Sequence, residues 1–165
     1  MASEKTAAAT GNVGELRFDP MAMLPFCGYN MADYFAHWLN IGRREGARLP
    51  QIFYVNWFRK GEDGKFLWPG FGENSRVLAW IFRRCDDEAE AVETPIGLVP
   101  PIGSGGIEID GLDISREAME KLLEVDADCW IEQLPQMREH YARFGDKLPG
   151  ELVAQFEALE RRLGT

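Results

Sequence analysis

Aromatic side chains are concentrated in the segment 56–74, NWFRKGEDGKFLWPGFGEN, which contains Trp57, Phe58, Phe66, Trp68 and Phe71. Much of this segment is glycine-rich, and exposed rings in a loop are unfavourable unless something covers them. Two rings that face each other across a slot can stack on a planar base, and each stack contributes roughly 1–3 kcal/mol. The segment therefore predicts a base-stacking site. The alternative interpretation is that the rings belong to the core and the glycines only form turns.

Gly70 and Gly72 lie on either side of Phe71, just before a helix that is predicted to open at 73–75. Glycine lets the backbone approach a ligand closely, because it has no side chain. The N–H groups in the first turn of a helix have no partner within the helix, so they are free donors. These donors could read the carbonyl oxygen of a purine, which makes this stretch the polar part of the same predicted site.

The other residue types that carry chemistry do not form the pattern of a catalytic centre. Residues 100–111, PPIGSGGIEIDG, are rich in glycine, but no Lys-Ser/Thr pair follows them, so they predict a surface loop rather than a P-loop. His37 lies in a predicted helix and is interpreted as structural, whereas His140 is predicted to lie in an exposed, charged helix. Cys27 has no neighbouring histidine or charge that would mark a nucleophile. With two histidines and three scattered cysteines, no metal site is predicted.

The overall charge argues against two classes of partner. The 165-residue chain has 18 Lys and Arg against 27 Asp and Glu, a formal net charge of −9, whereas nucleic acids and anionic membranes bind basic surfaces. The sequence has neither an apolar stretch of roughly 18 residues nor an apolar run of signal-peptide type. Scattered cysteines fit a reducing compartment. We therefore expect one compact, cytoplasmic domain with neither a nucleic-acid nor a membrane partner.

The N-terminal half contains helix and strand signals around the aromatic segment. Apolar offsets of three and four predict a helix that follows the N-cap Asn30 and ends at Gly42 or Gly46. Residues 51–58, QIFYVNWF, are apolar nearly throughout and predict a central strand. Residues 73–85 predict a helix whose inner face consists of Val77, Leu78, Ile81 and Phe82.

The C-terminal half is predicted to be mainly helical. Residues 92–114 predict loops and short extended pieces, and Ser115 is the predicted N-cap of the next helix. Another helix begins near 126–128, and Pro135 is expected to kink or break it. Residues 148–163, LPGELVAQFEALERRL, predict a closing amphipathic helix. Together the elements predict a mixed α/β fold.

The aromatic segment and its flanks resemble the GTP-dependent phosphoenolpyruvate carboxykinases. FGENSR, within NWFRKGEDGKFLWPGFGENSRVLAWI, is highly specific to that family. DPMAMLPFCGYNMADYFAHWLN and TPIGLVP follow in family order, and SEKTAAAT resembles the active-site lid. The resemblance implies the C-terminal part of a carboxykinase-type nucleotide-binding lobe. Within that single domain it implies a lid-like mobile segment (1–16), a guanine-pocket region (17–114) and a helical tail (115–165).

The resemblance also implies an activity and a set of binding residues. Family enzymes convert oxaloacetate and GTP to phosphoenolpyruvate, GDP and CO2. By resemblance, Phe58 and Phe71 would sandwich the guanine, and Phe66 would close its edge. The residues implied to read the base beside Phe71 are Gly72, Glu73 and Asn74. The lid residues are Thr6, Ala7, Ala8, Ala9, Thr10 and Gly11, and closure of this lid would exclude water and protect the enolpyruvate intermediate.

The chain departs from the family in its length. Family members are several times longer, and their P-loop, Mn2+ (or Mg2+) ligands and arginine-rich phosphoenolpyruvate site lie upstream of the lid. Phosphoryl transfer depends on positioning and on neutralisation of charge by metal ions and cations. We therefore expect the chain to bind GTP or GDP but to be inactive alone, with no catalytic residue and no metal ligand of its own.

Two other functions stay open beside a carboxykinase. A stand-alone guanine-nucleotide-binding module would recognise the base without catalysis. A truncated gene product would have no function and would stay in solution through its charge. The family resemblance further implies gluconeogenic or anaplerotic metabolism in the cytoplasm, and a monomer.

Overall fold

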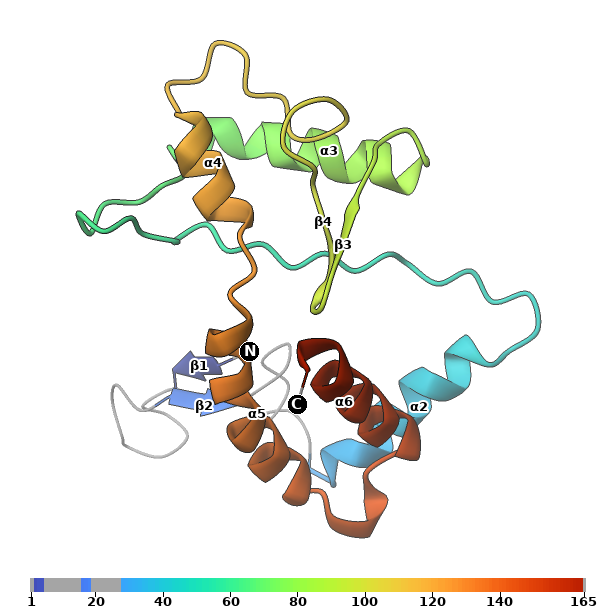
Figure 1. The fold of residues 1–165 in the computed structure, drawn as a ribbon. Coiled ribbons are helices and arrows are strands. Elements are labelled where there is room, and N and C mark those ends of the chain that lie inside the picture. The colour runs from blue at the N-terminus through green and yellow to red at the C-terminus, as the bar shows by residue number, and fades with distance from the viewer. Residues whose placement is uncertain (1, 5–15, 19–27, 165) are drawn as a thin grey trace. The chain divides into compact units, whose positions relative to one another are not determined.

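The computed structural model describes residues 2–4, 16–18 and 28–164 (Figure 1). Contacts between residues divide the chain into two compact units. Unit 1 comprises Met1–Leu49 and Cys129–Thr165, and unit 2 comprises Pro50–Asp128. The predicted lid residues, Thr6 to Gly11, lie outside the described residues.

Helices and short antiparallel strands make up the described elements, which confirms the predicted mixed α/β class. In chain order they are β1 (Ala2–Glu4), β2 (Leu16–Phe18), α2 (Met31–Gly42), η3 (Phe71–Glu73), α3 (Asn74–Cys85), β3 (Val92–Thr94), β4 (Gly97–Val99), α4 (Arg116–Leu123), α5 (Ala127–Ala142), η4 (Gly145–Lys147) and α6 (Gly150–Leu163). No helix in the described ranges is both long enough and apolar enough to span a bilayer.

In unit 1, Asn30 caps helix α2, as the sequence predicts. Its Oδ1 accepts the backbone N–H of Ala32 at 2.9 Å, and its Nδ2 donates to the carbonyl oxygen of Phe144 at 3.1 Å. Met31 and Ala32, in the first turn, are buried in one cluster with Phe144. The cap therefore fixes both the start of α2 and its contact with the turn that follows α5.

Helices α5 and α6 complete unit 1. A kink or a break is expected at Pro135, and the break does not occur, because α5 continues through that residue. Proline removes a single N–H from the helical ladder, and the buried neighbour Leu134 packs the helix at this point. The closing helix α6 ends with Gly164 in the left-handed region at φ 83°, a conformation that glycine adopts without steric cost.

Unit 2 begins with the segment 51–58, and here the strand prediction is wrong. Among the described residues, nothing pairs with this segment, and it forms no strand. Its side chains alternate in exposure, with Ile52 and Tyr54 exposed and Phe53 half-buried against the ring of Trp80 at 6.2 Å between centroids. The apolar composition reflects this alternating packing, while a strand also needs a hydrogen-bonded neighbour.

The core of unit 2 forms around Trp68, Val77 and Met119. Partly buried apolar side chains surround these three, namely Val55, Trp57, Ile81, Ile107, Ile109, Leu112, Ile114, Leu122 and Leu123. The cluster thus joins the end of the 51–58 segment, helix α3, the loop before α4, and α4 itself. Ser115 caps α4, as predicted, through its Oγ, which accepts the N–H of Ala118 at 3.1 Å.

The buried face of α3 differs from the predicted one. Val77 is buried and Ile81 packs against the core, both as expected, but Leu78 and Phe82 are exposed, and Trp80 is buried in their place. The indole of Trp80 donates to the carbonyl oxygen of Gly105 at 3.2 Å. Burial of this larger ring together with its hydrogen bond rotates the packed face away from the narrower aliphatic stripe.

Two arginines of α3 hold the loop before α4 in place. Arg76 donates through Nη1 to the carbonyl oxygens of Glu108 and Asp110, both at 3.1 Å. Arg83 donates through Nη2 to the carbonyl oxygen of Gly106 at 2.8 Å. The N-terminal end of α3 is therefore fixed on a packed support.

Strands β3 and β4 pair antiparallel in register Val92 to Val99, which confirms the short extended pieces predicted there.

Candidate functional site

The three phenylalanines of the predicted stacking site all have exposed rings. Phe58 is 70% exposed, Phe66 56% and Phe71 97%, whereas Trp68, in the same stretch of sequence, is 5% exposed. Leaving three large rings in water is unfavourable for an isolated domain. The interpretation of the aromatics as core therefore applies to Trp68 and not to the phenylalanines.

A small hairpin brings Phe58 and Phe66 together. Lys60 and Phe66 form an isolated antiparallel bridge, which brings the chain on either side of the turn together. The two ring centroids are 5.9 Å apart at an interplanar angle of 60°. The ammonium group of Lys60 lies 5.3 Å from the centroid of Phe66, and it adds a cation–π contact that the sequence analysis did not anticipate.

The turn of this hairpin is closed by short-range hydrogen bonds. The Gly61 N–H donates to the Lys65 carbonyl oxygen at 2.9 Å. The Lys65 N–H donates to Asp63 Oδ1 at 3.0 Å, and this backbone hydrogen bond lowers the pKa of the Asp63 carboxyl. Gly64 adopts φ 76°, which strongly favours glycine. The turn sequence therefore determines the register that places the two rings on one face.

An arginine ties the hairpin to the end of α4. The guanidinium of Arg59 donates to the carbonyl oxygen of Glu124 at 2.8 Å and to that of Leu122 at 3.3 Å. Arginine offers several donors in a rigid plane, so one side chain can hold two carbonyls. The base of the hairpin is thus attached to the core while its tip and rings face solvent.

Phe71 is presented by a backbone turn at the start of helix α3. Gly70, at φ 99°, redirects the chain, and Phe71 then opens the short helix η3. The Glu73 N–H donates to the Gly70 carbonyl oxygen at 2.9 Å. A Cβ placed on Gly72 would meet no heavy atom within 4 Å, so space beside the ring is open. Among the described residues, the Phe71 ring contacts no other aromatic ring.

Glu73 and Asn74 are both held by side-chain contacts. The Glu73 carboxylate accepts from Arg76 Nε at 2.5 Å. The buried indole of Trp68 donates through Nε1 to Asn74 Oδ1 at 2.9 Å. Sequence analysis identified both acceptor residues but missed Trp68 and Arg76 as the groups that fix them. For the contact between Trp68 and Asn74, the sequence signal is a tryptophan six positions before the first residue of a helix.

These residues form two exposed features, an aromatic pair on the hairpin and a helix start that carries a third ring. The hairpin brings Phe58 and Phe66 into contact, and the η3–α3 start places Phe71, Gly72, Glu73 and Asn74 in sequence at one helix terminus. Such an arrangement can stack on a planar heterocycle and can donate hydrogen bonds to its edge.

Metal ligation is not supported within this part of the molecule. In the ranges 2–4, 16–18 and 28–164, no three His, Cys, Asp or Glu side chains lie close enough together to hold a metal ion.

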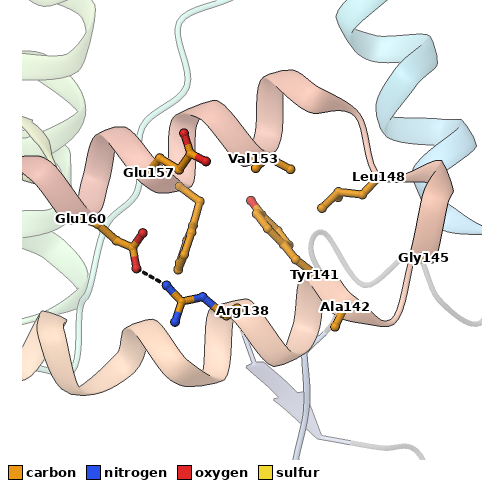
Figure 2. Close-up of a pocket in the computed structure, with 9 residues that line it drawn as sticks. Arg138, Tyr141, Ala142, Gly145, Leu148, Val153, Glu157 and Glu160 are labelled. Atoms are coloured by element: carbon orange, nitrogen blue, oxygen red, sulfur yellow. Dashed lines mark hydrogen bonds and ion pairs between the residues drawn. The ribbon is translucent and has the colours of Figure 1, made fainter. Parts of the chain in front are cut away.

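A separate cavity of about 340 Å3 lies in unit 1, between α5 and α6 (Figure 2). Arg138 forms an ion pair there with Glu160 and lies 5.3 Å from the ring centroid of Phe156. Tyr141 packs edge-on to that ring at 6.0 Å, and burial raises the pKa of its phenol. The predicted site residues do not line this cavity, and its arginine already has a carboxylate partner.

Fold and site together define a mixed α/β domain with exposed aromatic rings on a hairpin and at a helix N-terminus. Residues 1–162 match the family model described as the phosphoenolpyruvate carboxykinase C-terminal P-loop domain. The chain therefore belongs to the GTP-dependent phosphoenolpyruvate carboxykinase family. The description names a P-loop, although residues 1–165 contain no Gly-x-x-x-x-Gly-Lys-Ser/Thr sequence.

Several curated relatives are named phosphoenolpyruvate carboxykinase (GTP). The chain is 52% identical over 165 residues to the protein of Neocallimastix frontalis, and this match covers 99% of the chain and 27% of the relative. It is 52% identical over 164 residues to that of Treponema pallidum (strain Nichols), and the match covers 98% of this chain and 26% of the relative. The Renibacterium salmoninarum protein is 51% identical over 165 residues, and the match covers 99% of this chain and 27% of the relative. The chain thus spans about a quarter of the length of these relatives.

Proposed function

We propose that this chain provides the guanine-binding site of a GTP-dependent phosphoenolpyruvate carboxykinase. The complete enzyme converts oxaloacetate and GTP to phosphoenolpyruvate, GDP and CO2. The observation that carries the proposal is the exposure of three phenylalanine rings, one of which, Phe71, lies three residues before Asn74. Membership of a family whose relatives are named for GTP supports guanine as the base.

Each site residue has a proposed role in holding the nucleotide. Phe58 and Phe71 stack on the two faces of the guanine, and each stack contributes roughly 1–3 kcal/mol. Phe66, in contact with Phe58, closes the edge of the base. Polar groups at Gly72, Glu73 and Asn74 read its hydrogen-bonding atoms.

The phosphates and the metal ion are proposed to bind outside this chain. Mn2+ or Mg2+ would neutralise charge on the transferred phosphoryl group. The described residues offer neither clustered metal ligands nor a P-loop sequence, so they do not fit that role. We therefore expect the isolated chain to show no turnover of oxaloacetate with GTP.

The remaining parts of the proposal concern the domain and its setting. The chain acts as one domain in which 1–16 is the lid over the substrates, 17–114 the guanine-pocket region and 115–165 a helical tail. Glu4 of β1 pairs with Leu16 of β2, and this pairing of residues on either side of 5–15 supports the proposal. The enzyme is proposed to act as a cytoplasmic monomer in gluconeogenesis, without nucleic-acid or membrane partners.

A titration with GDP, with ADP as the comparison, tests the proposal. Trp57 precedes Phe58, and Trp68 lies between Phe66 and Phe71 in sequence, so both can report on the site through their fluorescence. We expect saturable quenching by GDP that Phe71→Ala weakens at least tenfold, which corresponds to about 1.4 kcal/mol. Phe82→Ala is the matched control, since Phe82 is also exposed but lies further along α3. Equal responses to GDP and ADP would contradict the proposal.

The alternative function is a stand-alone module that binds guanine nucleotides without catalysis. The same exposed rings favour it, because the site does not require a metal. An open reading frame that continues upstream of Met1 into a P-loop supports the carboxykinase. A native protein that begins at Met1, binds GDP and has no Mn2+-dependent turnover supports the module.

A further inference from the structure

The Trp68–Asn74 hydrogen bond connects the core of unit 2 to the candidate site. Trp68 is 5% exposed and packs in the buried cluster with Val77 and Met119. Its Nε1 lies 2.9 Å from Oδ1 of Asn74, the first residue of α3. The indole therefore holds the Asn74 side chain from the buried side, while the exposed ring of Phe71 lies between them in sequence.

The chemistry of the indole decides how the Asn74 amide is oriented. An indole N–H can only donate, whereas a carboxamide has one accepting oxygen and one donating NH2 group. Only the oxygen of the amide can face Trp68, so the NH2 group is left as the outward end. Among the described residues, no acceptor contacts this Nδ2, so both of its hydrogens are available to a ligand.

We propose that Trp68 is a positioning residue that turns Asn74 into an obligatory donor, and so makes the site select purines that carry an oxygen at C6. The inference rests on the proposed function. The 6-oxygen of guanine accepts from the NH2 group, whereas the 6-amino group of adenine presents a second donor to it. Two facing donors leave buried polar groups unpaired, which is a strong basis for discrimination between similar ligands.

A purely structural role for Trp68 predicts a different result. The bond also closes the short loop 68–74, which contains Gly70 and Gly72. If the bond only held this loop and Phe71 in place, its loss would weaken stacking on every purine equally. Selectivity at C6 therefore separates amide orientation from loop support.

The test measures the affinities of the full chain for four nucleoside diphosphates by isothermal titration calorimetry. GDP and IDP carry the 6-oxygen, whereas ADP and 2-aminopurine riboside diphosphate do not. We expect Trp68→Phe, which keeps an apolar ring but removes the donor, to weaken GDP and IDP about tenfold. Binding of ADP and of the 2-aminopurine nucleotide should change less than twofold.

Trp80→Phe is the matched control. Trp80 is also buried and also donates its indole N–H, but to the carbonyl oxygen of Gly105. It should leave the ratio of GDP to ADP affinity unchanged. Equal weakening of all four nucleotides by Trp68→Phe, or no change in the ratio, would overturn the inference while the proposed function stands. A wild-type chain without preference for GDP over ADP would overturn both.

A measurement on the wild-type chain keeps the inference testable if Trp68→Phe does not fold. In 15N-edited NMR spectra, the Trp68 indole N–H should exchange slowly with solvent with or without GDP. The Asn74 Nδ2 protons should shift on addition of GDP or IDP but not of ADP. Fast indole exchange, or the same Asn74 shift with all nucleotides, would contradict the proposed orientation.

Discussion

The aromatic side chains of the two units have opposite environments. In unit 1, Phe144 is 8% exposed, and its ring lies 5.5 Å from Phe35 and 5.1 Å from His140 in edge-on contacts. In unit 2, Phe71 is 97% exposed, and Phe58 is 70% exposed. The residue type is the same, so the difference comes from what surrounds each ring. Helices cover the rings of unit 1, while a hairpin and a glycine turn present those of unit 2 to solvent.

This contrast separates residues that stabilise the fold from residues that serve a ligand. A buried ring contributes to the free energy of unfolding through the area that it removes from water. An exposed ring contributes little to folding, and it keeps its face free for stacking. The contrast predicts that substitutions in unit 1 change stability and that substitutions of the exposed rings change binding.

The largest expected effect is on stability, in unit 1. Phe144→Ala should lower the free energy of unfolding by about 3–5 kcal/mol, because it removes a buried ring and leaves a cavity. Phe71→Ala should change it by less than about 0.5 kcal/mol, as is usual for exposed positions. Urea denaturation followed by circular dichroism measures both. Similar losses for the two variants would break the contrast.

The second expected effect is on binding, in unit 2. Phe58→Ala should weaken GDP binding by about 1–3 kcal/mol, the value of one stack, with little effect on unfolding. Tyr54→Ala is the control, since Tyr54 is 76% exposed in the same segment but lies outside the site. Calorimetric titration of both variants with GDP gives the comparison. Comparable losses of affinity in the two variants would argue for a general effect of the segment.

A smaller effect should come from the cap that joins α2 to the turn after α5. Asn30→Ala removes both hydrogen bonds of the side chain and should destabilise the chain by about 1–2 kcal/mol. Asn30→Asp keeps the oxygen that caps Ala32 but loses the donor to Phe144. It should therefore recover part of the loss. Thermal unfolding of the three chains measures this order, and an Asp variant as unstable as Ala would contradict it.

The smallest effect concerns the pH dependence of unit 1. Burial, reinforced by the charge of Arg143, lowers the pKa of His140 below its usual value of 6.5. The unfolded chain therefore binds this proton first as the pH falls. The stability linked to His140 is fully present above pH 6.5 and is lost as the pH falls through the folded-state pKa.

Unfolding free energies between pH 8 and pH 5, compared between the wild type and His140→Asn, isolate this contribution from the carboxylates. The wild type should lose more stability than the variant as the pH falls. Parallel pH profiles for the two chains would mean that burial of His140 has no net effect on folding.

Local signals in the sequence predicted several elements correctly. Asn30 and Ser115 are N-caps in the structure, because a short polar side chain before an apolar-periodic run satisfies backbone donors wherever the helix later packs. The amphipathic pattern of 148–163 likewise predicted α6. The resemblance carried by the residues around FGENSR agrees with the family model.

The errors concern features that depend on a distant partner. Residues 51–58 have strand composition, but whether they form a strand depends on a hydrogen-bonded neighbour that no local pattern reveals. The inner face of α3 was predicted correctly at Val77 and Ile81 but not at Leu78 and Phe82. The buried Trp80 packs against Phe53 and donates to Gly105, contacts 27 and 25 positions away in sequence. The continuation of α5 through Pro135 likewise depends on packing rather than on propensity.

The sequence by itself determined the caps, the turn at 61–64 and the aromatic content of the candidate site, since these depend on residue type and short spacing. Only the tertiary structure decided which rings are covered and which face solvent. It also decided that the Asn74 oxygen meets the Trp68 indole, and so which end of the amide is free. The physical reason is that burial and hydrogen-bond partnership are properties of pairs of residues, and folding brings together pairs that the sequence does not mark as neighbours.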